Sequence, residues 1–416
     1  MSHMLGVESE VGQLRQAIVH RPGLELTRLT PENCDELLFD DVLWADRARE
    51  EHDVFTQVLR DQGVSVHHFA DLLAQTLALP EAKAFVLDRV CTIHRVGPTL
   101  TASLRALAED LDCATLADLL IGGITKTDLS PLRAGSLRLQ SLGADDFILP
   151  PVPNTLFQRD NSAWIYGGVS IHPMAKPARQ RESIHSRAVY RFHPMFADAA
   201  FPTFYGDDDA DHQPATLEGG DIHVLGRGAV LIGMGERTTP MAVEILAREL
   251  FRHQAATQVI AVQLPKSRAF MHLDTVLTMI DTATFVRYPD LDVSTMATWT
   301  ITPADPQETV EHDTGGLHVE AREDLFATIA DALGVERVTV LAADEDTRAA
   351  QREQWDDANN FLTVAPGVVI GYERNTVTNR MLEEHGIKVL PIPGSELGRA
   401  RGGSRCMTCP IQRDGI

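Results

Sequence analysis

The sequence predicts an α/β fold in which about five ββαβ modules close around an axis, with a helical bundle inserted into them. Three observations predict it. Pairs of short apolar runs recur along the chain, and most pairs flank a short turn segment that contains glycine. An amphipathic segment and another apolar run follow each pair, which is the order strand, strand, helix, strand. One long segment breaks this order and shows only helical spacing.

The first module is expected near the N-terminus. Residues 14–20 form an apolar run that ends at Arg21-Pro22, which is typical of a strand. Residues 46–62 place Val54, Phe55, Val58 and Leu59 on one helical face and stop at Gly63. Residues 64–69 then predict a second strand.

The remaining modules are predicted from hairpins, each followed by a helix and a strand. They comprise residues 222–232 with a helix through 243–250 and a strand at 258–264; residues 276–288 with a helix at 325–333 and a strand at 337–341; and residues 361–370 with a helix at 376–385 and a strand at 387–390. A further module begins at residues 162–171. The repetition favours a closed, pseudo-symmetric arrangement.

Residues 71–146 lack alternating strand patterns. Leucines at 100, 104, 107 and 111, and again at 116, 119 and 120, recur at helical spacing. We therefore expect an inserted α-helical domain at 71–146, serving packing or oligomerisation, and an α/β catalytic domain made of residues 5–70 and 147–416.

Composition excludes several classes of function. The chain has 416 residues and a formal net charge of −22, which opposes binding to nucleic acid and mildly favours a cationic small molecule. We find no apolar run of about 18 residues and no signal-peptide pattern, so we expect a cytoplasmic protein without a membrane partner. Its 5 cysteines are too few and too scattered for a disulfide framework.

A glycine-rich loop near the C-terminus, Arg401-Gly-Gly-Ser-Arg405-Cys406-Met-Thr-Cys409-Pro410, predicts a nucleophile. A thiol is the most reactive side chain near neutral pH, and a cation such as Arg405 is expected to favour the thiolate of Cys406. The glycines allow a ligand to approach the backbone closely.

Acidic residues and a histidine precede the first strands of other modules. Asp160, Glu218, and His272 with Asp274 hold these positions. Equivalent ends of modules converge in a closed radial fold, so these side chains are expected to share one central pocket with polar chemistry. His272 lies two residues before Asp274, which points both side chains the same way in an extended segment. An imidazole there could act as general acid and base.

These stretches, together with Asn33–Asp41 and Pro153–Phe157, resemble the arginine deiminase family of the guanidine-modifying (pentein) superfamily. The resemblance covers nearly the whole chain. It implies a five-fold pseudo-symmetric α/β propeller with an inserted α-helical bundle. It also implies hydrolysis of L-arginine to L-citrulline and ammonia through a covalent thiouronium on Cys406, without metal or organic cofactor, and a homo-oligomer, either dimer or tetramer.

The resemblance also implies roles for single residues. Asp160 and Asp274 would accept hydrogen bonds from the guanidinium, which is planar and rich in N–H donors. Glu218 would lie beside His272 and favour its protonated form. The expected substrate-binding residues are Asn154, Arg179 and Arg237 at the α-carboxylate, Arg401 on a mobile loop, and Phe157 and Leu37 around the pocket.

Other readings remain. Cys406 and Cys409 have the spacing of a redox dithiol or half a zinc site, but a second ligand pair is missing and Cys409 is expected to be a packing thiol. Agmatine, a methylated arginine or a transferable amidino group are alternative substrates. A catalytically silent binding protein is an alternative of another class.

Overall fold

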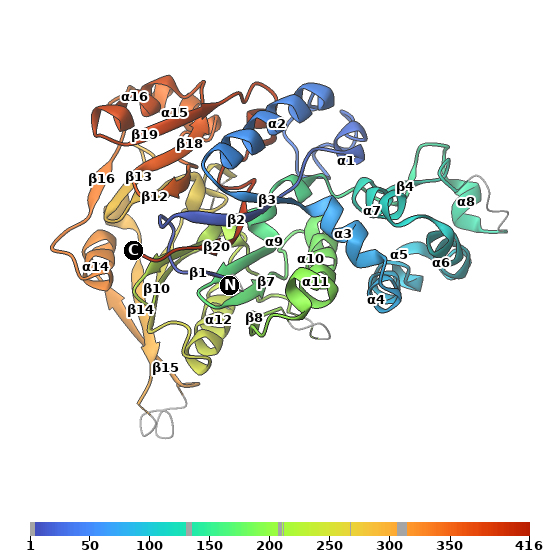
Figure 1. The fold of residues 1–416 in the computed structure, drawn as a ribbon, viewed down its shortest axis with the longest axis horizontal. Helices are drawn as coiled ribbons and strands as arrows, with labels where there is room; N and C mark the ends of the chain where they lie inside the picture. Colours follow the sequence, from blue (N-terminus) through green and yellow to red (C-terminus); the bar gives the residue numbers. More distant parts are fainter. Residues whose placement is uncertain (1–4, 130–134, 207–209, 211, 267, 306–313) are drawn as a thin grey trace.

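The computed structural model describes residues 5–129, 135–206, 210, 212–266, 268–305 and 314–416. Within these residues the strands form five sheets of three or more strands and one two-stranded ribbon, made of β4 Ile124–Thr125 and β5 Phe147–Leu149. Most helices lie around the outside of the sheets (Figure 1). The chain therefore has a mixed α/β fold.

All five larger sheets contain the same triplet of strands. An antiparallel pair comes first, and the third strand runs parallel to the second member of the pair. The triplets are β6 Ser162–Ile165, β7 Gly168–Ile171 and β8 Thr203–Tyr205; β9 Ile222–Gly226, β10 Ala229–Met234 and β11 Gln258–Gln263; β12 Leu277–Asp281, β13 Thr284–Arg287 and β16 Thr339–Leu341; β17 Leu362–Ala365, β18 Val368–Tyr372 and β19 Lys388–Ile392; and β20 Cys409–Arg413, β2 Leu14–Val19 and β3 Ser65–His68.

A helix lies between the second and third strands of each triplet. In the same order these helices are α10 Gln180–Phe192, α12 Pro240–Arg252, α14 Leu325–Leu333, α16 Thr376–Glu384 and α2 Ala45–Asp61. Each module thus has the predicted order. Helix α14 shows how the sequence sets both ends of a helix. Asp324 caps its first turn, and Gly334 follows its last turn with a left-handed φ of 64°.

One part of the predicted helical face of α2 is wrong. Phe55 and Leu59 are buried, but Val54 is 43% exposed. Successive helical residues are turned by about 100° around the axis, which places Val54 at the side of the buried stripe.

Both ends of the chain complete one sheet (Figure 1). Strand β20 pairs antiparallel with β2 and parallel with β1 Gly6–Val7. It is therefore the first strand of the N-terminal module, whereas the sequence analysis described residues 401–410 only as a glycine-rich loop. Its partners lie at the opposite end of the chain, where no local pattern can point to them.

Two strands extend the sheet of β9–β11 and were not predicted. They are β14 Thr298–Pro303 and β15 Leu317–Arg322. Only Leu317 of β15 is buried, so that strand lacks the alternating apolar pattern that sequence analysis depends on. The other described α-helices outside the predicted helical segment are α1 Leu24–Thr27, α9 Gln158–Asn161, α11 Pro194–Ala197 and α15 Thr347–Trp355.

The segment expected to be helical contains six helices in its described part. They are α3 Phe69–Leu77, α4 Pro80–Val90, α5 Ile93–Val96, α6 Thr101–Asp110, α7 Cys113–Gly122 and α8 Leu137–Ser141. They lie together at one end of the molecule (Figure 1). Helices α3 and α4 pack against α10, and the segment shares a hydrophobic core with that module, where Leu73 and Val86 join Ile165 and Val189.

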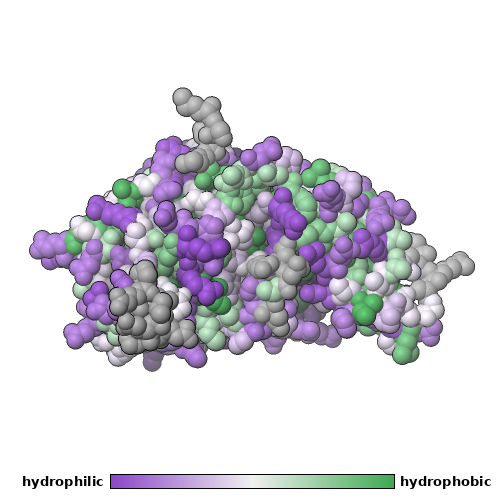
Figure 2. Space-filling view, turned by 90° about the horizontal axis from the view of Figure 1, so that it is seen from below, coloured by the Kyte–Doolittle hydropathy of each residue, from purple (hydrophilic) through white to green (hydrophobic). Residues whose placement is uncertain are grey.

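None of the helices in the described ranges combines the length and apolar composition needed to cross a bilayer. On the face in Figure 2, hydrophilic residues are spread widely and strongly hydrophobic ones occur in small separate groups.

Buried charges also join the chain ends. Arg405 Nε donates to Glu10 Oε2 at 3.1 Å, and Arg405 Nη1 donates to Asp274 Oδ2 at 2.6 Å. All three side chains are buried. Burial alone would raise the pKa of Glu10, but the Arg405 and Arg159 guanidiniums outweigh it and hold that pKa well below its usual range. Glu10 therefore stays ionised near neutral pH.

The substitution Glu10→Gln leaves Arg405 with only one carboxylate partner. We expect it to lower the free energy of unfolding by about 3 kcal/mol, measured by urea denaturation at pH 7. Arg15→Gln is the control, because it breaks an exposed ion pair to Asp414 between the same chain ends. That variant should keep a midpoint close to the wild type. Equal effects of both substitutions would contradict this account.

Candidate active site

Five equivalent positions, each just before the first strand of a module, meet at the centre of the fold. Asp160 precedes β6, Glu218 precedes β9, Asp274 precedes β12, and Cys406 precedes β20. His272 lies beside Asp274, and Asn360 holds the matching position before β17. The structure therefore brings together the acids, the histidine and the cysteine that the sequence analysis singled out.

His272 forms a charged pair with Glu218. Its Nε2 lies 2.7 Å from Glu218 Oε2, and its Nδ1 lies 3.7 Å from Asp160 Oδ1. Burial would lower the pKa of His272, but Asp160 and the hydrogen bond to Glu218 outweigh it and raise the pKa to about 9. The imidazole is therefore protonated near neutral pH, in the direction expected. A Cβ at Gly220 would lie 2.7 Å from the ring, so only glycine fits there.

Two arginines surround the same acids. Arg179 Nη1 donates to Asp160 Oδ2 at 2.7 Å, and its Nε and Nη2 form a fork on Glu182 at 3.0 and 2.9 Å. Arg237 Nη1 contacts both oxygens of Glu218 at 3.4 Å. Burial raises the pKa of Glu218, but Arg237 and His272 outweigh it and hold that pKa well below its usual range. Neither arginine is a solvated surface residue.

Cys406 and Asp274 lie side by side. The Cys406 sulfur is 3.8 and 4.0 Å from the Asp274 carboxylate oxygens, and one of those oxygens is held by Arg405. Cys406 is buried, with 4% of the residue exposed. Cys409, by contrast, contacts Ser162 and Tyr190 in the interior, which agrees with a packing role. All 5 cysteines are free thiols.

The expectation that Arg405 favours the thiolate is only partly right. Burial raises the pKa of the Cys406 thiol well above its usual value, and Asp274, Asp160 and Asp357 raise it further. Arg405 lowers this pKa, but by less than burial and the carboxylates raise it. The free protein therefore holds a neutral thiol and a protonated histidine in the lining of one cavity.

The sequence analysis missed Asn360. Its Nδ2 donates to the Cys406 sulfur at 3.1 Å, and its Oδ1 accepts from the backbone N–H groups of Arg405 and Cys406. Asparagine before a strand is usually a turn residue, so its type gave no signal. Its position did: it matches Asp160 and Glu218 in the module repeat.

A small cavity lies between these side chains. It has a volume of about 20 Å³, enough for one water molecule. Its lining comprises Leu38, Asn154, Phe157, Asp160, Arg179, Arg237, Met271, His272, Thr275, Ala400, Arg401 and Cys406. Leu37 is absent from this lining. Its carbonyl instead accepts from Asn154 Nδ2 at 2.7 Å and so supports the wall.

Ala400 and Arg401, at the start of the loop of residues 400–403, line this cavity. Arg401 has a left-handed φ of 61°, and its guanidinium lies 3.6 Å from the centroid of the Trp355 ring. The Phe157 ring packs directly against Gly402, where a Cβ would clash with it.

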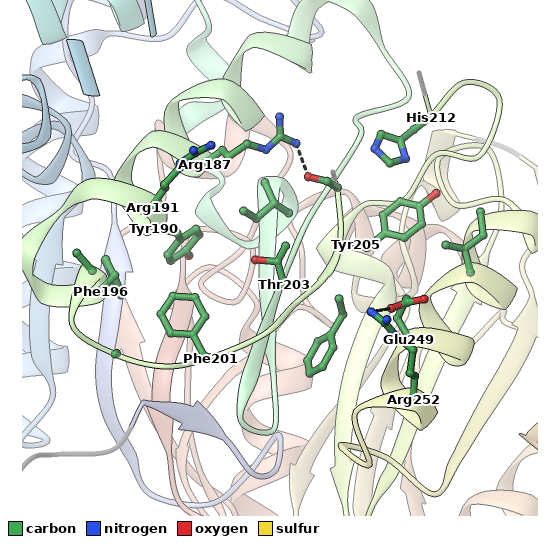
Figure 3. A pocket seen from close by; sticks show the side chains of 16 residues that line it. Arg187, Tyr190, Arg191, Phe196, Phe201, Thr203, Tyr205, His212, Glu249 and Arg252 are labelled. Atoms are coloured by element: carbon green, nitrogen blue, oxygen red, sulfur yellow. Dashed lines mark hydrogen bonds and ion pairs between the residues drawn. The ribbon is translucent and has the colours of Figure 1, made fainter. Parts of the chain in front are cut away.

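A larger cavity of about 840 Å³ lies elsewhere, between α10, β8 and α12 (Figure 3). Its described lining contains one carboxylate, Glu249, which pairs with Arg252 at 2.6 Å. Arg187 there donates to the Gly206 carbonyl at 2.8 Å. This lining has no cysteine and no spare carboxylate, so we place the chemistry at the small central cavity.

No metal centre is evident in the part of the chain that the structure describes, because no three His, Cys, Asp or Glu side chains there converge as ligands.

Comparison with known proteins points to one group of enzymes. A family model described as arginine deiminase matches residues 35–413. Among solved structures, DDAH from Pseudomonas aeruginosa complexed with citrulline is similar, with a TM-score of 0.52 and 14% identity over 96% of this chain and 100% of that chain.

Two amidinotransferases are similar to the same degree. One is the inosamine-phosphate amidinotransferase of Streptomyces griseus, with a TM-score of 0.51 and 15% identity over 100% of this chain and 98% of that chain. The other is an amidinotransferase of saxitoxin biosynthesis from Microseira wollei, with a TM-score of 0.52 and 15% identity over 99% and 98%. At such low identity these structures establish the shared fold alone.

The raised pKa of His272 makes stability depend on pH. A group whose pKa rises from 6.5 to about 9 on folding stabilises the native state fully below pH 6.5 and loses this effect as pH rises through 9. We therefore expect the free energy of unfolding of the wild type to exceed that of His272→Asn by about 3 kcal/mol at pH 6. Urea unfolding of both proteins from pH 6 to 9 should show this difference shrinking. A constant difference would contradict the protonated state of His272.

Proposed function

The chain belongs to the arginine deiminase family, and from this membership we propose that it hydrolyses the guanidinium of L-arginine to give L-citrulline and ammonia. Family membership supports a guanidine-modifying enzyme. The observation that carries the finer proposal is that the Cys406 sulfur contacts Asp274, while Cys406 lines the same cavity as His272 and Asp160. These groups supply a nucleophile, an acid and anionic acceptors for one cationic substrate.

Substrate charge would activate the thiol. Burial and carboxylates keep Cys406 protonated in the free protein. A guanidinium placed against Asp160 and Asp274 offsets those carboxylates, so the thiol can release its proton to solvent. Asp160 Oδ1 is buried and lies 3.7 Å from His272 Nδ1, but it has no hydrogen-bond partner within the described residues and could accept from a substrate N–H.

Hydrolysis then proceeds in two covalent steps. The thiolate attacks the guanidinium carbon, and His272 gives its proton to the departing nitrogen, which leaves as ammonia. Water adds to the remaining thiouronium carbon and gives a proton to the neutral His272. Collapse of this adduct breaks the carbon–sulfur bond, and citrulline and the free cysteine result. Glu218 favours the protonated imidazole at the start of each cycle.

The other end of arginine would meet the two site arginines. Within the described residues, the buried Nε of Arg237 has no hydrogen-bond partner and could donate to the α-carboxylate. Arg179 and Asn154 line the same cavity. A cavity of about 20 Å³ cannot hold arginine, so we propose that the loop of residues 400–403 moves to admit it.

We also propose that the five modules are the blades of a five-fold pseudo-symmetric α/β propeller. The identical strand triplets and the convergence of their leading ends support this. The proposed division assigns residues 71–146 to an inserted helical domain and the rest to the catalytic domain. A homo-oligomer remains a proposal from the family alone.

The purified protein should release equal amounts of citrulline and ammonia from L-arginine. We expect Cys406→Ala to lower kcat by at least about 1,000-fold, because the variant cannot form the covalent adduct. Cys409→Ala is the matched control, since this thiol lies only three positions away in the sequence but contacts Ser162 and Tyr190 instead. It should retain activity.

Parallel substrates separate the alternatives. Agmatine lacks the carboxylate and should be a poor substrate. Turnover of agmatine or dimethylarginine in preference to arginine would replace the proposal by another guanidine hydrolase. Transfer of the amidino group to an added amine would indicate an amidinotransferase. Arginine binding without turnover would support a silent binding protein.

A further inference from the structure

The side-chain amide of Asn360 forms four hydrogen bonds, all with atoms close to Cys406. Its Nδ2 donates to the Cys406 sulfur at 3.1 Å and to the Asp274 carbonyl at 3.0 Å. Its Oδ1 accepts from the N–H groups of Arg405 and Cys406, each at 3.1 Å. An amide has two N–H donors and two acceptor lone pairs, so every one is used. The residue is 1% exposed.

The orientation of this amide is fixed by its surroundings. Two backbone N–H groups face one end of it, and they can only be met by the oxygen. The nitrogen must then face the sulfur and the Asp274 carbonyl, which are both acceptors. The N–H that points at the sulfur is therefore required by the local backbone.

The sulfur needs such a donor. Asp274 lies 3.8 Å away, and Asp160 and Asp357 also disfavour a negative charge on the sulfur. The Arg405 guanidinium is engaged with Asp274 and Glu10. Among the hydrogen-bond contacts of the sulfur in the described structure, Asn360 Nδ2 is the donor and the nearest partner.

We propose that Asn360 is a catalytic residue that donates a hydrogen bond to the Cys406 sulfur as it becomes the attacking thiolate, and that its Oδ1 holds the backbone of the nucleophile in place. A preorganised donor aimed at developing negative charge stabilises that charge without reorganisation. The inference rests on the proposed role of Cys406 as nucleophile. With this role for Asn360, the module of β17–β19 also contributes a side chain to the site, from the same position before its first strand as in the other modules.

Two variants separate the donor from the backbone clamp. Asn360→Asp keeps oxygen acceptors for both backbone N–H groups but replaces the donor with a carboxylate. Asn360→Ala removes donor and clamp without adding charge. The readout is the pH dependence of Cys406 alkylation by 2-chloroacetamidine, a small cationic reagent, with the alkylated cysteine located by mass spectrometry. Thermal unfolding of each variant is measured in parallel.

We expect both variants to move the midpoint of the alkylation profile to higher pH, Asn360→Asp by at least about one pH unit. We also expect kcat for arginine to fall about 100-fold in Asn360→Asp, with a much smaller change in KM. A folded Asn360→Asp with the wild-type midpoint would overturn the proposal, since the clamp alone would then suffice. If Asn360→Asp does not fold, a wild-type midpoint in Asn360→Ala would do the same.

Asn375→Asp is the matched control. It makes the same change at a buried amide that donates to the Asp356 carbonyl at 2.9 Å, away from the sulfur. Its midpoint should equal that of the wild type, and an equal upward shift would overturn a specific role for Asn360. Alkylation reports on the thiol whether or not arginine is turned over. A wild type that is alkylated at Cys406 but releases no citrulline would refute the proposed reaction and still leave the Asn360 test intact.

Discussion

The buried guanidinium of Arg405 is the contact on which the geometry of the site depends. It donates to Asp274, to Glu10 and to the backbone carbonyl of Ile222, which lie in three separate parts of the chain. A buried cation without carboxylates costs several kcal/mol, so the fold must hold both acids against it. Asp274 is thereby fixed beside the sulfur of Cys406, the residue that follows Arg405. The pair of Arg405 with Glu10 also ties the N-terminal segment to the loop that leads into β20.

Much of this arrangement can be predicted from local patterns in the sequence. The hairpins, the amphipathic helices and their glycine stops predicted the modules, because each depends on neighbouring residues. The module repeat then placed Asp160, Glu218 and His272 at equivalent ends. From those positions their convergence followed without any knowledge of distances. The identity of the chemistry came from the combination with Cys406 and the family resemblance.

The remaining features depend on partners far apart in the sequence. Strand β20 was missed because it pairs with β1 and β2 at the other end of the chain. The thiol state of Cys406 was misjudged because three carboxylates approach it in space while only Arg405 adjoins it in sequence. Asn360 was missed because an amide carries no charge and resembles a turn residue. Sequence position in the repeat would have found it, and residue type could not.

The ion pairs of the free site would also favour the proposed substrate, which carries a guanidinium at one end and a carboxylate at the other. Arg179 is buried and paired with Asp160, the acid proposed to accept the guanidinium. A substrate that takes Asp160 must offer Arg179 something in return, or leave part of a buried cation without its partner. In the proposed binding mode, the guanidinium of L-arginine would pair with Asp160, and its carboxylate would compensate Arg179. Agmatine has the guanidinium but no carboxylate. If it displaced Arg179 from Asp160, Arg179 would keep its two hydrogen bonds to Glu182 but would gain no new carboxylate partner. The selectivity proposed for this site therefore follows from the ion pairs that substrate binding must break.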